Sequence, residues 1–314
     1  MPITLTDIRQ AAKRIQPLIH RTPVLTSETL NRTSGAQLFF KCENFQRAGA
    51  FKMRGAANAT LSLSKTDRNQ GVATHSSGNH GQALAKAAQS VGIPAYIVMP
   101  RTAPEVKKRA VAEYGAEIIF CEPTLQARED TLAQVIDRTK ATFVHPYNND
   151  QVITGQATAA LELIEDTEEL DVLMAPVGGG GLLSGTALST HYLLPQATVI
   201  AGEPTGADDA YRSLQAGEII PSEQPNTIAD GLLTSLGNKT FPIIQAYVKE
   251  IITVSDEEII TAMRLIWERM KIIIEPSCAV PLAALLSRAS DFSDKRIGII
   301  LTGGNVDLTS LPFS

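Results

Sequence analysis

The sequence has few cysteines and few aromatic residues. Its 314 residues include only three cysteines and one tryptophan, and aromatic side chains make up 5% of the chain. Cys42, Cys121 and Cys278 are too few and too widely spaced for a disulfide framework or a paired metal-binding motif. We therefore expect a reducing environment and a cytoplasmic location.

A strong charge bias and a long apolar run are also absent from the sequence. The 28 Lys and Arg against 33 Asp and Glu give a formal charge of −5, without a block of like charge. This balance argues against a nucleic-acid-binding or anionic-membrane surface. No run approaches the ~18 apolar residues of a membrane span, and the first residues lack the basic and apolar regions of a signal peptide. The length and the 44% hydrophobic content predict a globular protein of about two domains.

Short β-branched runs alternate with stretches of helical periodicity along most of the chain. The runs that predict strands span 72–75, 95–99, 117–121, 142–145, 172–177, 197–202 and 296–301. The helical patterns span 80–91, 104–114, 125–140, 155–165, 182–193 and 256–271. The strand runs are apolar without strict alternation, as in sheets that are covered on both faces. The pattern predicts an α/β fold with a doubly wound parallel sheet, and the turn-forming residues 146–149 mark a candidate domain boundary.

Four glycines in succession follow one of the predicted strands. Gly178, Gly179, Gly180 and Gly181 stand between the run 172–177 and a helical pattern. In open α/β sheets, ligands bind beyond the carboxyl ends of the strands. Each glycine costs roughly 0.5–1 kcal/mol of additional backbone entropy, so four together need a reason. The pattern favours a cradle of backbone N–H groups for a phosphate over a simple tight turn.

A run of small and polar residues lies at another junction between a strand and a helix. It contains Ser76, Ser77, Gly78, Asn79 and His80. Capping of the following helix explains one or two of these residues. The alternative is that hydroxyl and backbone donors together hold a carboxylate. The residues of this run alone do not decide between the two.

Two further segments contain residues with chemical potential. Lys52 lies between two apolar residues. It is either an ordinary lysine with a partly buried stem or a desolvated amine that can bond covalently to a carbonyl group. Thr302 follows the run 296–301 and precedes two glycines that permit close approach of the backbone. Neither motif is specific by itself.

Taken together and in this order, the motifs resemble the fold-type II pyridoxal-phosphate enzymes, in particular the serine racemases and serine/threonine dehydratases. The resemblance covers nearly the whole chain and is closest to the serine racemase branch. The segments that carry it are 21–24, 40–43, 50–56, 76–80, 178–181, 229–231 and 303–308. Three positions depart from the family pattern, because Ala48, Ala50 and Ala157 replace a common threonine, serine and glycine.

The resemblance implies a role for each residue of a cofactor site. Lys52 is expected to hold pyridoxal 5'-phosphate as a Schiff base and to act as one proton-transfer base. Ser77 is expected to act as the second base on the opposite face of the cofactor. The substrate carboxylate is expected to contact Ser76, Ser77, Gly78, Asn79 and His80. The phosphate of the cofactor is expected to contact Gly178, Gly179, Gly180 and Gly181, and its pyridine nitrogen is expected to contact Thr302. The remaining cofactor atoms are expected to contact Phe51, Asn79, Gly231 and Glu275.

The resemblance also implies a domain arrangement. Residues 1–69 and 147–314 are expected to form a large cofactor-binding domain. Residues 70–146 are expected to form a smaller inserted domain that moves when substrate binds, in a protein that forms homodimers.

Two additional ligands follow from the same resemblance. Glu203, Asp209 and the carbonyl of Ala207 match a divalent-cation loop, and hard oxygen ligands suit Mg²⁺, Ca²⁺ or Mn²⁺. The alternative is an acidic helix start that favours the helix dipole. Gln82 and Tyr114 match nucleotide contacts in the racemase branch, so ATP is a candidate effector.

The predicted function is a serine racemase with serine/threonine dehydratase activity on small β-hydroxy amino acids. The nearest alternative is a threonine or 3-hydroxyaspartate dehydratase with little racemase activity. A different class, the NAD-dependent Rossmann oxidoreductases, is the second alternative, since Gly179, Gly181 and Ser184 narrowly miss the dinucleotide fingerprint. That class leaves Lys52 and Ser77 without a role.

Overall fold

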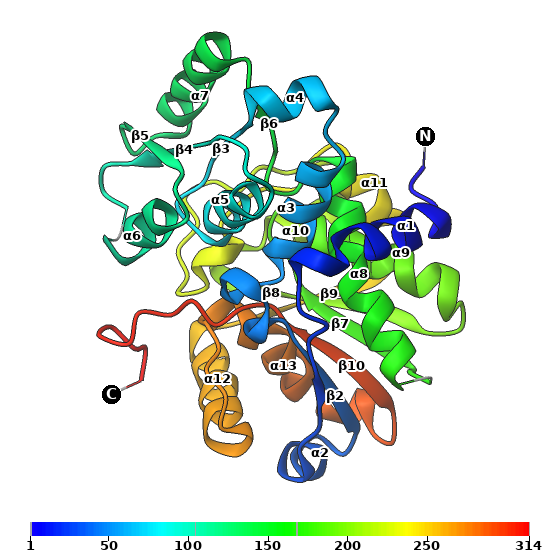
Figure 1. Cartoon of the computed structure of the whole chain (residues 1–314). Coiled ribbons are helices and arrows are strands. Elements are labelled where there is room, and N and C mark those ends of the chain that lie inside the picture. The colour runs from blue at the N-terminus through cyan, green and yellow to red at the C-terminus, as the bar shows by residue number, and fades with distance from the viewer. Residues whose placement is uncertain (1, 104, 168, 314) are drawn as a thin grey trace.

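The chain forms two separate β-sheets, each covered by helices (Figure 1). The computed structural model describes residues 2–103, 105–167 and 169–313. The larger sheet has the order β1 (Val24–Leu25), β2 (Gln37–Cys42), β10 (Arg296–Leu301), β7 (Val172–Pro176), β8 (Thr198–Pro204) and β9 (Val248–Val254). The smaller sheet has the order β5 (Glu117–Cys121), β4 (Ala95–Pro100), β3 (Val72–His75) and β6 (Thr142–Phe143). Neighbouring strands are parallel except β1 and β2, so the predicted α/β class is confirmed.

Helices cover both faces of the larger sheet. Helices α8 and α9 pack on one face, with α1, α3 and α11 outside them, and α13 packs on the other face with α12 and α2. Helices α5, α6 and α7 pack on the smaller sheet. The helices are α1 (Leu5–Ile15), α2 (Glu28–Ser34), α3 (Lys52–Leu61), α4 (Lys65–Gln70), α5 (Asn79–Val91), α6 (Glu105–Glu113), α7 (Leu125–Thr139), α8 (Asp150–Thr167), α9 (Gly181–Leu193), α10 (Asp209–Ala216), α11 (Thr240–Tyr247), α12 (Asp256–Met270) and α13 (Pro276–Ser287).

The strand order places a topological switch point in each sheet. In the larger sheet, the chain runs from β7 outward through β8 to β9, whereas β10 lies on the other side of β7. In the smaller sheet, the chain runs from β3 through β4 to β5, and β6 returns to the other side of β3. Ligands of open α/β sheets bind at such points, beyond the carboxyl ends of the strands. The loops after β7 and β10, and those after β3 and β6, are therefore the expected site.

The seven strands predicted from the sequence are present, with ends that differ by at most two residues. The predictions missed β1, β2 and β9. Strand β1 has only two residues, Lys41 interrupts the apolar pattern of β2, and Lys249 and Glu250 interrupt that of β9. Helix α8 begins at Asp150, five residues before the predicted start at Gly155. Residue 104, where one predicted helix begins, lies outside the described residues. Among the described residues, no helix is long and apolar enough to cross a membrane.

Candidate active site

Lys52 is the first residue of α3 and lies between the two sheets. Its Nζ atom donates a hydrogen bond to the carbonyl oxygen of Pro146 at 3.0 Å, and Pro146 belongs to the segment that leads from β6 to α8. Burial lowers the pKa of Lys52 to about 8, while the negative charge of Glu275 acts in the opposite direction. Roughly a tenth of the amine is therefore uncharged at pH 7, and this uncharged form is the one that acts as a nucleophile.

Glu275, Asn79 and Asn305 form a hydrogen-bonded chain beside this lysine. The Asn79 amide donates to Oε1 of Glu275 at 2.8 Å, and the Asn305 amide donates to Oδ1 of Asn79 at 2.9 Å. Glu275 is 4% exposed. Burial, with a smaller effect of Asp230, raises the pKa of Glu275 to about 8. The chain joins the start of α5 on the smaller sheet to the start of α13 on the larger one.

Thr302 directly follows β10 and has a buried hydroxyl group. The residue is 3% exposed, and its Oγ1 atom has no hydrogen-bond partner. Its carbonyl accepts a hydrogen bond from the backbone N–H of Phe51 at 2.9 Å, which holds the segment before Lys52 against this loop. Buried hydroxyl groups nearly always have partners, so the orphaned Oγ1 fits a ligand atom such as a pyridine nitrogen.

The four glycines form the turn between β7 and α9. A Cβ atom on Gly179 would lie 2.2 Å from the ring of Tyr147, and one on Gly181 would lie 2.9 Å from the Tyr147 Cβ atom. Gly180 has a φ of +85° and caps α9 without any side-chain acceptor. Close packing therefore explains why side chains are excluded. The N–H groups at the start of α9 have no side-chain cap, and uncapped helix starts of this kind can bind phosphates.

The loop after β3 leaves a second set of uncapped N–H groups at the start of α5. Gly78 caps this helix and supplies no side-chain acceptor, and its own N–H donates to the Ser76 hydroxyl at 3.3 Å. The first N–H groups of the helix remain for a carboxylate. Ser77 is half-buried in the same loop.

The imidazole of His80 is held by the backbone of the segment that follows β6. Its Nε2 atom pairs with the carbonyl oxygen of Val144 at 2.9 Å, and Nδ1 is buried without a partner. Burial lowers the pKa of His80 to about 3, so the ring is neutral. His80 can contribute its backbone N–H to the anion site, whereas its side chain ties α5 to the strand β6.

Gly231, another residue that is expected to contact the cofactor, lies near the glycine turn. The N–H of Gly231 donates to the Ser277 hydroxyl at 3.0 Å. A Cβ atom on Gly178 would lie 3.3 Å from the carbonyl oxygen of Gly231. Gly231 therefore borders the phosphate end of the site, and Ser277 belongs to the same helix start as Glu275.

The predicted cation loop contains two buried carboxylates. Glu203 is the last residue but one of β8 and accepts hydrogen bonds from the backbone N–H groups of Ala210 and Tyr211 at 2.9 and 2.7 Å. Both carboxylate oxygens of Asp209 are buried without a well-aligned hydrogen-bond partner, although the Ser222 hydroxyl lies near enough to lower the pKa of this carboxyl. Burial raises the pKa of Glu203 to about 8 and that of Asp209 to about 6. Within the described part of the chain, no three acidic, histidine or cysteine side chains gather as a complete ligand set.

The two predicted nucleotide-contact residues lie at the smaller sheet. Gln82 is buried on α5, and Tyr114 is half-buried just after α6. The Lys86 ammonium lies 5.1 Å from the centre of the Tyr114 ring, so a cation already occupies one face of that ring.

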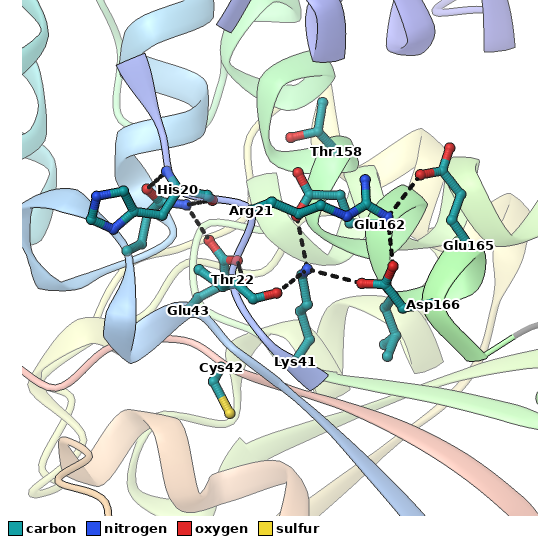
Figure 2. A network of polar contacts seen from close by, with 12 residues as sticks. His20, Arg21, Thr22, Lys41, Cys42, Glu43, Thr158, Glu162, Glu165 and Asp166 are labelled. Carbon is teal, nitrogen blue, oxygen red and sulfur yellow. Dashed lines mark hydrogen bonds and ion pairs between the residues drawn. The ribbon is translucent and has the colours of Figure 1, made fainter. Parts of the chain in front are cut away.

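A buried ionic network that the sequence reasoning missed supports α3, and Figure 2 shows the part of it around Lys41, Glu43 and Glu162. Arg54 is fully buried two residues after Lys52, and it pairs with Glu43 and with Glu162 through two short hydrogen bonds each, at 2.7 to 2.8 Å. Lys41 is also fully buried and lies 2.7 Å from Glu162. One feature of the sequence could have revealed this network: Lys41 and Arg54 each lie in a segment that is otherwise apolar.

The two parallel α/β sheets, the desolvated lysine between them, the uncapped glycine turn and the orphaned threonine hydroxyl define a pyridoxal-phosphate enzyme of fold type II. The family model described as pyridoxal-phosphate dependent enzyme matches residues 15–303, and the chain belongs to this family. The NAD-dependent alternative is therefore wrong.

Known relatives match over almost the full chain. A "beta-hydroxyaspartate dehydratase" of Paracoccus denitrificans is 53% identical over 311 residues, which are 99% of this chain and 99% of the relative. A "Serine racemase" of Dictyostelium discoideum is 53% identical over 315 residues, covering 98% of this chain and 97% of the relative. The crystal structure of the Dictyostelium discoideum serine racemase superposes with a TM-score of 0.94, at 52% identity and with 98% and 99% of the two chains covered.

Proposed function

We propose that the protein racemises serine and eliminates water from serine and threonine, using pyridoxal 5'-phosphate. The proposal is supported by the chain positions of the two candidate bases, since Lys52 begins α3 after β2 of the larger sheet and Ser77 lies in the loop after β3 of the smaller sheet. This arrangement gives the site one candidate base from each side. Similarity to serine racemases supports the choice of substrate.

Bound cofactor supplies an electron-withdrawing ring that makes the α-proton of the amino acid acidic. The first N–H groups of α5 hold the substrate carboxylate, and Asn79 keeps that helix start against Glu275. Lys52 removes the α-proton of the L-enantiomer, since burial keeps its pKa at about 8. Ser77 removes or returns the α-proton from the side of the substrate opposite Lys52.

Thr302 would hold the pyridine nitrogen of the cofactor and would thereby set how strongly the bound ring withdraws electrons. A neutral hydroxyl at the pyridine nitrogen, unlike a carboxylate, leaves that nitrogen largely unprotonated. A weaker electron sink favours reactions in which a β-substituent leaves quickly or the proton returns promptly. Racemisation and β-elimination from hydroxy amino acids are such reactions.

A product assay with purified holoenzyme tests the proposal. L-Serine should yield D-serine and pyruvate together, and L-threonine should yield 2-oxobutyrate. Borohydride should bleach the yellow protein and leave the reduced cofactor attached to a peptide that contains Lys52. A colourless protein that gains no absorbance from added pyridoxal phosphate contradicts the proposal.

A second candidate function is the dehydration of 3-hydroxyaspartate. It is supported by similarity to the Paracoccus denitrificans "beta-hydroxyaspartate dehydratase" over 99% of both chains. Competition between serine and 3-hydroxyaspartate in one assay distinguishes the two functions. The preferred substrate is the one that the enzyme turns over faster when both are present at equal concentration.

We also propose that Glu203, Asp209 and the Ala207 carbonyl hold Mg²⁺, Ca²⁺ or Mn²⁺. The two unpartnered oxygens of Asp209 support this assignment, because buried carboxylates are otherwise costly. The ion would hold β8 and the start of α10 together and would take no part in proton transfer.

The remaining proposals concern assembly and control. Residues 70–146 would move as a small domain against residues 1–69 and 147–314, because their strands form a sheet of their own. The protein would act as a cytoplasmic homodimer, with ATP bound near Gln82 and Tyr114. Sedimentation and an ATP titration of serine turnover test the dimer and the effector.

A further inference from the structure

A cavity that has no role in the assignments above lies where the chain passes between the two sheets. It has a volume of about 150 Å³, and the residues that line it include Ser62, Leu63, Phe143, Asn149 and Gln151. Ser62 and Gln151 are exposed, so the cavity opens to solvent. An engineered protein cavity of about 150 Å³ binds benzene. The space is therefore large enough for a small organic molecule.

The cavity touches both connections between the sheets. The chain leaves α3 through Ser62 and Leu63 on its way to the smaller sheet, and it returns after β6 through the segment that contains Asn149. Domain movements are absorbed at such connecting segments, where a few residues change their backbone angles. A movement of the smaller sheet against the larger one would therefore change the shape of this cavity.

Hydrogen bonds fix the orientation of the Gln151 side-chain amide. The Arg14 guanidinium donates to Oδ1 of Asn58 at 2.6 Å, so the amide nitrogen of Asn58 is the atom that donates to Oε1 of Gln151 at 3.1 Å. The Ser62 hydroxyl donates to the same Oε1 atom at 3.0 Å. The oxygen of Gln151 is thus occupied, and its NH₂ group remains for a ligand.

The Asn149 amide is oriented in the same way. Its Oδ1 atom accepts hydrogen bonds from the backbone N–H groups of Gln151 at 2.9 Å and Val152 at 3.1 Å, and thereby caps the start of α8. Among the residues that the structure describes, no hydrogen bond uses the amide nitrogen of Asn149 or Gln151. Two residues of the cavity wall therefore have N–H donors to spare and amide oxygens that are already used.

The rest of the wall favours an uncharged ligand. None of the described residues that line the cavity is charged, and Leu63, Phe143 and Val144 contribute apolar side chains. Removal of a charged group from water without a charged partner is costly. A molecule that suits this cavity therefore combines an acceptor oxygen with a small apolar group and carries no net charge.

We propose that this cavity binds a small uncharged molecule with a carbonyl oxygen, of the short-chain amide class, and that its binding strengthens the binding of the amino-acid substrate. The inference rests on the proposed function, which assigns that substrate. Asn79 at the start of α5 bonds to Glu275 at the start of α13, and this contact joins the two sheets beside the proposed carboxylate site. A molecule that fits the cavity in this arrangement stabilises the arrangement itself. The coupling is reciprocal, so the substrate also strengthens binding in the cavity.

A cysteine in place of Ser62 allows the cavity to be filled permanently. Ser62 is exposed, so the change should not disturb folding, and the three native cysteines are buried. The thiolate of Ser62→Cys displaces iodide from iodoacetamide, which leaves a short neutral amide attached at the cavity. Asn69→Cys is the matched control, because Asn69 is exposed on α4 and is not among the residues that line the cavity.

Alkylation of Ser62→Cys holoenzyme should lower the KM for L-serine. We expect a decrease of about fivefold or more, which is the lower end of the usual range of allosteric coupling. Unmodified Ser62→Cys and alkylated Asn69→Cys should stay within about twofold of the wild-type KM. Iodoacetate attaches a carboxylate in place of the amide, and its effect should be smaller because no cation lines the cavity.

Binding of a free ligand can be measured without turnover. Trifluoroacetamide is a small neutral amide whose ¹⁹F signal broadens when it binds to a protein. Wild-type holoenzyme should broaden this signal in a saturable way, whereas alkylated Ser62→Cys should not, because its cavity is already filled. Trifluoroethylamine has the same apolar end but no carbonyl oxygen, and its signal should stay sharp with both proteins.

Equal broadening of the trifluoroacetamide signal by wild type and alkylated Ser62→Cys would overturn the inference. An unchanged or raised KM after alkylation would overturn it as well, and equal broadening of the two fluorinated compounds would reject the class of ligand. Failure of the proposed function looks different. Wild-type protein would then turn over neither serine nor threonine, while the ¹⁹F measurement would still report on the cavity.

Discussion

The Asn79 amide and the Glu275 carboxylate join the two sheets of the molecule at 2.8 Å. Asn79 begins α5, which covers the smaller sheet, and Glu275 caps α13, which packs on the larger one. The start of α5 is the proposed carboxylate site. Its position relative to Lys52 is therefore set by a contact between the two halves, as expected for a site that closes around a substrate.

Removal of the Ser77 hydroxyl should separate the two directions of proton transfer. Racemisation requires a base on each face of the cofactor, whereas elimination from the L-enantiomer requires only Lys52. We expect Ser77→Ala to lose racemisation and D-serine elimination by about 10²–10⁴-fold, the usual contribution of a positioned base, and to retain L-serine dehydration. Steady-state kinetics on both enantiomers measure this difference. Equal losses on both would make Ser77 only a carboxylate contact.

Attachment of the cofactor to the apoenzyme should depend on the protonation of Lys52. The neutral amine is the nucleophile, and burial lowers its pKa from 10.5 to about 8. The rate should therefore rise with pH up to about 8 and level off above it, because the amine is then mostly neutral. Stopped-flow absorbance after addition of pyridoxal phosphate gives the profile. A rate that keeps rising to pH 10 would contradict a desolvated lysine.

Removal of a divalent cation should destabilise the folded protein. An ion that binds only the folded state contributes about 2.7 kcal/mol when its concentration is 100-fold above its Kd. Chelation should thus lower the melting temperature of wild type, and Asp209→Asn should abolish that response. Asp208→Asn is the matched control, since Asp208 is only half-buried and pairs with Arg212 at 2.7 Å. If chelation does not change the melting temperature, the loop binds no cation and is only an acidic helix start.

Replacement of Arg54 should destabilise the chain more than most single changes. Arg54→Met leaves the buried Glu43 and Glu162 without their common partner, and breaking a buried ion pair in this way costs about 3–5 kcal/mol. Denaturant unfolding measures the loss. The triple change Arg54→Met, Glu43→Gln and Glu162→Gln should recover part of it, because the unpaired charges are then gone. A triple variant as unstable as Arg54→Met would mean that lost packing dominates.

Strands and ligand loops could be predicted from local sequence, whereas contacts between distant segments could not. The runs that became β3, β7 and β10 are continuous and apolar, so their ends and the loops after them were recognisable. Strand β2 was missed because its buried Lys41 finds a partner in Glu162, more than a hundred residues away. The Nδ1 atom of His145 accepts a hydrogen bond from the backbone N–H of Asn148, and this contact depends on a turn geometry that residue types alone do not specify.

The charges around Arg54 balance, with Arg54 and Lys41 against Glu43 and Glu162, and all four side chains are buried. Mobile ions screen exposed charges over about 8–10 Å at physiological ionic strength but reach buried pairs poorly. The helix that presents Lys52 is thus anchored by electrostatics that dissolved salt hardly weakens. Ionic strength is therefore a selective probe of this enzyme. Its effects on turnover report on binding of the charged substrate and on surface charges, because the ionic network that supports Lys52 is not weakened by salt.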